Sequence, residues 1–599
     1  MADVSGLSSC WRIRGQADSP TQSLRGAESK MGRERALREV GAIRKDPGGK
    51  LSVLLVFPNS YFVGMSNLGF HAIYAALNSL DYVRCERSFL PEAILRGVSR
   101  KGVAPRSVES GDVPSRFDVI AFAVPFENDY PNLVRFLRLA GLKPRRDERW
   151  FGDPLVLAGG SAVTANPEPL AAFVDAFVIG DGERIVEALA RAVFDARQLR
   201  LDRQDLMARL AEIPGVYIPG LFEPEYGPDG AVSAVHSQGN SAQVARRWTP
   251  KEELQPAHTV VFSEETEFGD LGLVEVVRGC PRSCAFCMVS FCNRPVRFLG
   301  VEQILAQVAK IKTHRQRVGL LGSAVTEHPD LLSIVEGVLK MGMGISISSL
   351  RADRITPQLL GLLRRGGQRT ITIAPEAGDS GLRASLAKPI ADGALIDLAT
   401  QVASAGFETL KLYFMVGVPG ESPGDVQRIV SLVKQMKHGL RKRSLGRRDV
   451  LINVSVSSFV PKAHTPFQWE AMLPPGELAR RIKVIGTGLS GTRGVSVHAD
   501  VPKWAFVQGV LSRGDRRISK LVSALADTNF NWQRSREMID VNPEFFALRT
   551  RSRDEILPWA HIASGAPEDE LWRRLESYRA QTKRRTARAQ LANLTDPRA

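Results

Sequence analysis

The chain has few cysteines, and it lacks any long hydrophobic run. Six cysteines in 599 residues are too few for a disulfide-built scaffold, and four of them fall between Cys280 and Cys292. This grouping favours a metal or redox site. No stretch reaches the roughly 18 to 20 apolar residues of a membrane helix, and no apolar secretory segment opens the sequence. We therefore expect a protein of the cytoplasm without a membrane partner.

Acidic residues are outnumbered, because 64 Asp and Glu face 80 Lys and Arg, for a net charge of +16. Basic residues concentrate at 437–448 and at 573–588. Such a surplus attracts nucleic acid or acidic surfaces without sequence preference. A solvated loop and a solvated terminal helix are the more ordinary explanation of these runs. Nucleic-acid contact through this loop and tail therefore stays open as a partner.

The pattern of apolar residues divides the first half of the chain into three segments. Residues 1–48 show no sustained period and predict a disordered tail, in which Met31 is an alternative start. Residues 49–200 predict a parallel sheet covered on both faces, because near-continuous apolar strands alternate with helical stretches. Residues 201–270 predict a connector with a hairpin around 226–230. The strands of the sheet are expected at 51–57, 118–124, 154–160 and 175–180.

A second alternating series fills residues 271–500, and residues 501–599 predict a helical C-terminal region with a basic tail. Six strand–helix units predict a partial (β/α)6 barrel with its site at the strand carboxyl ends. The fold class is therefore α/β, with a Rossmann-like parallel-sheet domain, the partial barrel and a helical extension. The barrel strands are expected at 273–279, 317–323, 345–350, 369–375, 409–417 and 450–459.

Cys280, Cys284 and Cys287 follow the first barrel strand with the spacing C-x3-C-x2-C. Three thiolates suit an iron–sulfur cluster with one open iron, because a full cluster normally takes four cysteines. A structural zinc site wants a closed tetrahedron, usually built from two separated ligand pairs. Cys292 as a fourth ligand would close the open iron, and a buried or substrate-facing thiol is its alternative.

This loop, with Phe286 before its third cysteine, resembles the radical SAM superfamily. The resemblance implies that Cys280, Cys284 and Cys287 bind three irons of a [4Fe-4S] cluster. It implies that S-adenosylmethionine (SAM) chelates the fourth iron and is cleaved by one electron to a 5′-deoxyadenosyl radical. A reductant such as flavodoxin or ferredoxin would supply that electron, and Phe286 would pack near the adenine.

Two further segments resemble cofactor-binding motifs of that superfamily. Ala374–Gly378 resembles the fourth-strand motif, which makes Glu376 the expected catalytic and SAM-binding carboxylate. Gly417 and Gly420, in the segment Gly417–Glu421, resemble the fifth-strand turn near the adenine. A salt-bridged barrel carboxylate and an ordinary strand-to-helix turn are the respective alternatives.

Other strand ends complete the expected SAM pocket. Ser348, Ser349 and Arg351 could line the same cavity, although Ser and Arg are common at such ends. The segment Gly322–His328 departs from the Gly-Gly-Glu turn that binds the methionine amino group in many members. That backbone contact is therefore in doubt here.

The N-terminal domain resembles the cobalamin-binding domains that precede many radical SAM barrels. The resemblance rests on two glycine turns, Gly159-Gly160 and Gly180-Asp181-Gly182-Glu183. The Asp-x-His-x-x-Gly signature is absent, so cobalamin would bind without a protein histidine. His71 falls in an apolar helix pattern and is expected in the core. A structural or substrate-binding domain is the alternative.

Residues 50–565 as a whole resemble a family of B12-binding-domain radical SAM proteins. With cobalamin, the resemblance implies transfer of a methyl or other group to an unactivated carbon. The alternatives are an RNA-binding or RNA-modifying protein and a non-catalytic iron–sulfur protein. No substrate is implied.

Two later segments are ambiguous. In Pro461–Trp469, the side chains of His464, Gln468 and Trp469 could face substrate, although the prolines equally suit a rigid connector. The charged residues of Ser512–Arg517 predict a surface ion-pair network.

Overall fold

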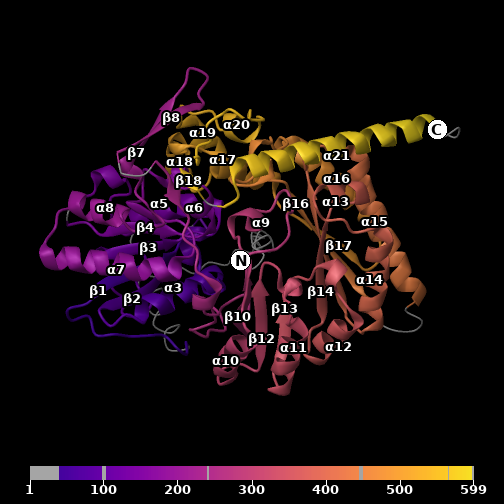
Figure 1. Cartoon of the computed structure of the whole chain (residues 1–599), viewed down its shortest axis with the longest axis horizontal. Helices are drawn as coiled ribbons and strands as arrows, with labels where there is room; N and C mark the ends of the chain where they lie inside the picture. Colours follow the sequence, from indigo (N-terminus) through magenta and orange to yellow (C-terminus); the bar gives the residue numbers. More distant parts are fainter. Residues whose placement is uncertain are drawn as a thin grey trace, which may run out of the picture.

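A computed structural model describes residues 39–97, 103–150, 152–238, 242–443, 449–563 and 565–595. Figure 1 shows an N-terminal α/β part beside a barrel, with the C-terminal helices lying across one end of both. Met31 and the rest of 1–38 lie outside the described residues. Within the described ranges, no helix is long and apolar enough to cross a membrane.

The N-terminal part is a six-stranded sheet with the order β2-β1-β3-β4-β5-β6. All four predicted strands form, and they pair in parallel. Helices α3 (Leu68–Asn78) and α7 (Gly182–Leu199) cover one face, and α5 (Tyr130–Leu139) covers the other. The strands are β1 (Leu51–Phe57), β2 (Val83–Phe89), β3 (Val119–Ala123), β4 (Leu155–Gly159), β5 (Ala176–Val178) and the antiparallel β6 (Val216–Tyr217).

Strand β2 escaped the sequence analysis because it carries charged residues that turn out to be buried. Arg87 is 1% exposed, and its guanidinium lies 2.7 Å from Glu39 Oε2 and 2.6 Å from Glu109 Oε1. Charged residues are almost never fully buried unless they are paired. The same contact corrects part of the expected tail, because Glu39, Ile43 and Lys45 contact the N-terminal domain, whereas residues 46–48 are exposed.

The second part is a partial barrel made of two four-stranded sheets. A parallel bridge between Leu350 and Ile373 joins the two sheets. All six predicted strands form, and one more parallel strand, β17, comes after them. The strands are β10 (Leu271–Arg278), β12 (Arg317–Gly322), β13 (Gly344–Ile347), β14 (Thr370–Glu376), β15 (Thr409–Val416), β16 (Leu451–Ser458) and β17 (Val495–Ala499), with β11 (Arg297–Phe298) antiparallel to β10.

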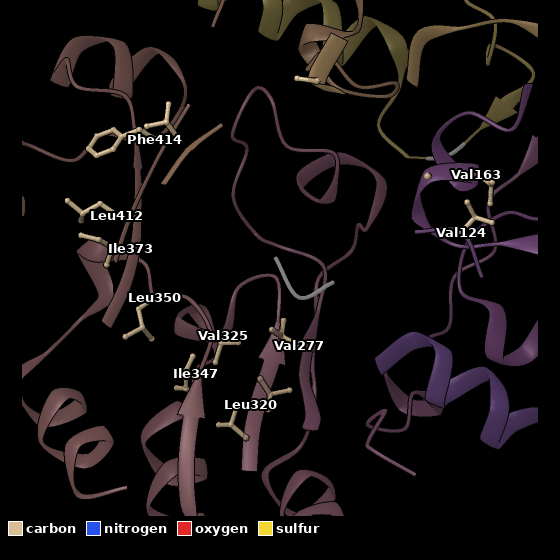
Figure 2. Close-up of a cluster of buried hydrophobic side chains, with 14 of the residues drawn as sticks. Val124, Val163, Val277, Leu320, Val325, Ile347, Leu350, Ile373, Leu412 and Phe414 are labelled. Carbon is tan, nitrogen blue, oxygen red and sulfur yellow. The ribbon is translucent and has the colours of Figure 1, made fainter. Parts of the chain in front are cut away.

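Helices between these strands cover the outside of the barrel. Leu410, Leu412 and Phe414 of β15 are fully buried in the apolar core, and Figure 2 shows Leu412 and Phe414 with other members of this core. Lys411 and Tyr413 alternate with them on β15 and line the cavity inside the barrel. The helices are α10 (Val301–Lys312), α11 (Leu331–Lys340), α12 (Pro357–Arg365), α13 (Ser380–Ser385), α14 (Asp392–Ser404), α15 (Pro423–Arg443) and α16 (Pro475–Leu489).

The C-terminal region contains α17 (Pro502–Arg513), α18 (Ser519–Asp527), α19 (Trp532–Glu537), α20 (Glu544–Ala547) and α21 (Glu568–Thr595). The expected surface network at Ser512–Arg517 is wrong, because Arg513 is 0% and Asp515 2% exposed. Arg516 Nε lies 3.0 Å from Glu168 Oε2 of the N-terminal part. These charges therefore hold the C-terminal region to the first domain.

The basic tail lies in α21, and the basic loop continues α15. Arg574 of α21 pairs with Glu570, Arg579 with Glu470, and Arg585 with Asp425. Side chains of the loop at 442–448 lie outside the described residues. Part of the positive charge of α21 is therefore neutralised within the chain.

Candidate functional site

A large cavity lies between the N-terminal sheet and the barrel. Its volume is about 1540 Å³, beyond the roughly 300–1,000 Å³ of pockets for drug-sized ligands. Its walls come from turns at the carboxyl edge of the N-terminal sheet, from the barrel interior and from α17. Both domains therefore offer the ends of their strands, where such sheets bind ligands, to one space.

The glycines expected to bind a cofactor at the N-terminal sheet all line this cavity: Gly159, Gly160, Gly180 and Gly182. Gly160 and Gly180 have φ of 124° and 116°, which strains any other residue. A Cβ on Gly160 would lie 2.6 Å from the carbonyl oxygen of Val124, and one on Gly180 would overlap that of Arg247. Glycine is therefore required by the fold at both turns, and the turns face the cavity.

The cavity also extends along one face of the N-terminal sheet. Leu51, Val53 and Leu55 of β1 line it there, together with Leu77 of α3 and Val193 of α7. All five side chains are apolar. This extension could accept an elongated group of low polarity.

Ion pairs hold the start of the cysteine loop to the N-terminal domain. Arg278, the last residue of β10, places Nη2 at 2.7 Å from Glu183 Oε1. Glu183 belongs to the Gly180–Glu183 turn, where Asp181 pairs with Arg297. The start of the expected cluster loop and the expected cobalamin-binding turn are therefore joined by ion pairs.

The three cysteines of the loop lie between β10 and α9 (Val289–Cys292). Cys284 is buried, and Cys280 and Cys287 are partly exposed. Burial raises the pKa of the Cys284 thiol to about 12. The positive charge of Lys388 lowers this pKa, and the charge of Cys287 raises it further. Glu376 also contributes to this shift. Glu376 therefore lies near the cysteine loop, and its contact with SAM stays a prediction.

Glu376 ends β14 in an unusual backbone conformation. Its φ is 71°, and the pairing of β14 with β15 is irregular there. A non-glycine residue in this region costs on the order of 1–3 kcal/mol, and such residues cluster at functional sites. Its Oε1 accepts a hydrogen bond from Lys388 Nζ at 2.8 Å. Glu376 thus forms a salt bridge, as expected for the alternative of a salt-bridged barrel carboxylate. It also lies near Cys284.

The end of the third barrel strand supplies residues to the cavity and to the surroundings of the cysteine loop. Ser348 lines the cavity, and Ser349 is half-buried. Arg351 Nε lies 2.7 Å from Asp353 Oδ1 and 3.5 Å from Glu327 Oε1, and its charge reaches Cys280 and Cys284. Glu327 belongs to the segment that departs from the Gly-Gly-Glu turn, and its carboxylate serves this ion-pair network.

The turn Gly417–Glu421 lies under α21. Glu421 Oε2 accepts from the backbone N–H of Gly417 at 2.7 Å and lies 2.5 Å from Arg481 Nη1. A Cβ on Gly420 would overlap Thr582 of α21. These contacts give the turn a packing role, and its place near the adenine stays a prediction.

Pro461–Trp469 is a buried connector. His464 Nε2 lies 3.0 Å from the carbonyl oxygen of Ala165, and burial lowers the pKa of His464 to about 4. Gln468 Oε1 accepts from the indole N–H of Trp559 at 3.1 Å. The substrate-facing alternative for this segment is therefore wrong. Phe286 packs against the apolar cluster that surrounds the connector, and its contact with adenine stays a prediction.

His71 is a core residue, as expected. Its Nε2 lies 3.0 Å from the carbonyl oxygen of Met65, and its Nδ1 accepts from the backbone N–H of Val260. Burial lowers the pKa of His71 to about 4. None of the described residues that line the cavity is a histidine.

Sequence reasoning did not find Asp129, Lys411 and Tyr413, which are among the polar residues that line the cavity. Asp129 Oδ1 accepts from Asn59 Nδ2 at 2.8 Å, and burial raises the pKa of Asp129 to about 7. Nothing in the local pattern around Asp129 marks it. For the other two a signal existed, because Thr-Leu-Lys-Leu-Tyr-Phe alternates polar and apolar residues, which predicts a strand with one polar face.

The cysteine loop fits an iron–sulfur cluster by its donor set. Thiolates are soft ligands that bind such clusters. In the described part of the chain, no three His, Cys, Asp or Glu side chains converge as a site for a single metal ion. Cys292, at the end of α9, is 1% exposed and lines the cavity. Its surroundings are those of a buried thiol beside the cavity.

Comparison with known proteins agrees with this architecture. Residues 69–219 match a model described as radical SAM proteins, N-terminal, and residues 274–433 match the radical SAM superfamily. The second match runs from β10 through the cysteine loop into α15. The fold and the site thus define a radical SAM enzyme with an implied [4Fe-4S] cluster and SAM. The chain belongs to the radical SAM superfamily, in the group that carries this N-terminal domain.

Relatives of similar length also exist. The uncharacterised protein MJ0966 of Methanocaldococcus jannaschii is 26% identical over 473 residues, 78% of this chain and 90% of its own. The methyltransferase TsrM of Kitasatospora setae, solved with cobalamin and a [4Fe-4S] cluster, has a TM-score of 0.47 at 12% identity and covers 90% of this chain and 100% of its own. OxsB, solved with aqua-cobalamin, has a TM-score of 0.44 at 15% identity, over 80% of this chain and 67% of its own. Likenesses with TM-scores below 0.5 decide neither the substrate nor the reaction of this chain.

Proposed function

We propose that Cys280, Cys284 and Cys287 hold the [4Fe-4S] cluster of a radical SAM enzyme whose substrate binds in the large cavity. The observation that carries this proposal is the position of the cysteine loop. It leaves the carboxyl end of β10 beside Glu376 and is tied by Arg278 to the turn that lines the cavity. When bound, the cluster and SAM supply a 5′-deoxyadenosyl radical, with the electron from a reductant such as flavodoxin or ferredoxin.

The residues around the loop divide the remaining work. The Glu376–Lys388 pair offers both a carboxylate and an ammonium at the end of β14, which suits the hydroxyl, amino and carboxylate groups of SAM. Arg351 adds positive charge near two of the thiols. The protein's part in radical chemistry is to orient the cofactor and exclude competing reactions, and the barrel wall and the N-terminal sheet would do this around the cavity.

We further propose that the N-terminal side of the cavity binds cobalamin, which supplies a methyl or other group for transfer to carbon. The glycine turns lie at the cavity wall, and the cavity extends between β1 and the helices α3 and α7. Both its volume and its apolar extension suit a ligand larger than ordinary cofactors. Because no described lining residue is a histidine, the cobalt would receive no imidazole from the protein.

Anaerobic reconstitution tests the cluster. Wild type should bind about four irons and show a [4Fe-4S] spectrum that shifts on addition of SAM. Cys284→Ala should lose the cluster, whereas the matched variant Cys292→Ala should keep it. A wild type that binds zinc instead of iron, or a spectrum that ignores SAM, would overturn the proposal.

Cobalt analysis of the same preparations tests the second cofactor. Two results together would support cobalamin binding. The protein should contain stoichiometric cobalt, and the electron paramagnetic resonance signal of its cobalt(II) should show no nitrogen splitting from an imidazole ligand. Iron without cobalt, after growth and reconstitution with cobalamin, would favour a substrate-binding N-terminal domain.

A further inference from the structure

The barrel interior carries a lysine that no carboxylate of the described residues pairs with. Lys411 of β15 is partly buried and lines the cavity. Its Nζ lies 4.9 Å from the centre of the Tyr413 ring, and among the described residues no carboxylate forms a salt bridge with it. Arg246 and Arg278, in the same cavity, are paired with acids.

Two acids that line the same cavity are engaged elsewhere. Asp500 accepts hydrogen bonds from the backbone N–H and the hydroxyl of Ser458, at 2.9 and 3.0 Å. Glu275 pairs with Arg278 at 2.8 Å. Lys411 thus presents to the cavity an ammonium without a carboxylate partner among the described residues, and charge-assisted hydrogen bonds to an anionic ligand are among the stronger polar contacts. The ammonium is therefore available to an anion that enters the cavity.

Lys411 stands at the centre of a polar row on the inner face of the second sheet. Strand register places Thr372 of β14 and Asn453 of β16 beside it, and neighbouring strands are about 4.8 Å apart. Tyr413 lies two residues further on the same face, with Ser455 beside it. An ammonium, two hydroxyls, an amide and a phenol thus share one patch of wall.

We propose that Lys411, with Thr372 and Tyr413, binds an anionic group of the substrate, a carboxylate or a phosphate. This rests on the proposed function, which puts the substrate in the barrel. Lys411 precedes Val416, the end of β15, by five residues, or about 16 Å at 3.3 Å per residue. The substrate is thus anchored deep in the barrel and reaches toward the strand ends, where the cysteine loop and Glu376 lie.

Anion binding to the reconstituted full-length protein tests the site, and SAM is left out because its carboxylate is another anion. The probes are inorganic phosphate and succinate, with succinamide as the uncharged analogue of succinate, and ligand-observed NMR gives the affinities. Lys411→Met and Lys411→Gln should weaken both anions about 10- to 100-fold, the loss expected for a charge-assisted hydrogen bond. Lys411→Arg should bind within a few-fold of wild type.

Lys483→Met, at an exposed site on α16, is the matched control and should bind as wild type does. Equal affinities in wild type and both neutral Lys411 variants would overturn the inference, as would a wild type that binds succinate no better than succinamide. The cluster spectrum of the same samples is read separately. A sound, SAM-responsive cluster without Lys411-dependent binding refutes the anion site alone, and Lys411-dependent binding without a cluster refutes the proposed function.

Discussion

Asp129→Asn should stabilise the protein at alkaline pH and leave its stability at low pH unchanged. Asp129 is 5% exposed, and both of its hydrogen-bonding neighbours, Asn59 and Asn132, are uncharged amides. Burial raises the pKa of its carboxyl from 3.8 to about 7. Asn keeps the oxygen that accepts from both amides and removes the charge that burial penalises.

The size of the effect comes from linkage between protonation and folding. Between pH 3.8 and 7 the folded state holds a proton that the unfolded state releases, so the free energy of unfolding falls as pH rises through this window. A shift of about 3 units corresponds to roughly 4 kcal/mol at pH 8, at about 1.4 kcal/mol per unit. A unit of about 150–250 residues gains about 2–4 °C in Tm per kcal/mol.

Differential scanning calorimetry at several pH values measures this difference directly. The Tm of Asp129→Asn minus that of wild type should be near zero at pH 4 and should rise to about 8–16 °C by pH 8. A difference that is flat with pH, or a variant less stable than wild type at pH 8, would refute the reasoning.

Three other sites lead to further predictions. Burial would raise the pKa of the Glu168 carboxyl, but Arg516 and His561 lower it to about 2. The ionised carboxylate should therefore stabilise the wild type above pH 4.5, and this contribution, on the order of 3 kcal/mol, should be lost as pH falls toward 2. Urea unfolding of Glu168→Gln should lack this acid dependence. Gly180→Ala should lower Tm and cobalt content, because its Cβ would overlap a backbone carbonyl. In the control Gly182→Ala, the Cβ meets only a side-chain methyl at 2.9 Å. Equal Tm values for the two variants would contradict this prediction. Glu376→Gln should weaken SAM about tenfold or more in a titration of the cluster spectrum while iron content stays, and the exposed control Glu302→Gln should titrate like wild type.

The sequence predicted most of the sheet framework because buried parallel strands read as apolar runs. It missed β2, whose Arg84, Glu86 and Arg87 look like surface residues until Glu39 and Glu109 are seen to neutralise Arg87. Those partners lie 22 and 48 positions away, beyond any local pattern. The buried charges near Arg516 escaped for the same reason.

Two of the site predictions depend on short local patterns, the spacing of the three cysteines and the motif around Glu376. The structure places Glu376 close enough to the cysteine loop to influence the Cys284 thiol, and the roles of these residues in binding a cluster and SAM stay predictions. Lys388, the partner of Glu376, and Asp129 depend on tertiary packing that joins separate loops. Lys411 was visible in principle in the alternation of β15, but only the cavity shows that this polar face is an inner wall.

The most direct test of the account is the electron paramagnetic resonance spectrum of the anaerobically reconstituted, reduced protein with and without SAM. The account predicts a [4Fe-4S]⁺ signal in wild type and in Cys292→Ala that changes when SAM is added, and its loss in Cys284→Ala. A signal that survives in Cys284→Ala, disappears in Cys292→Ala, or ignores SAM in wild type would contradict it.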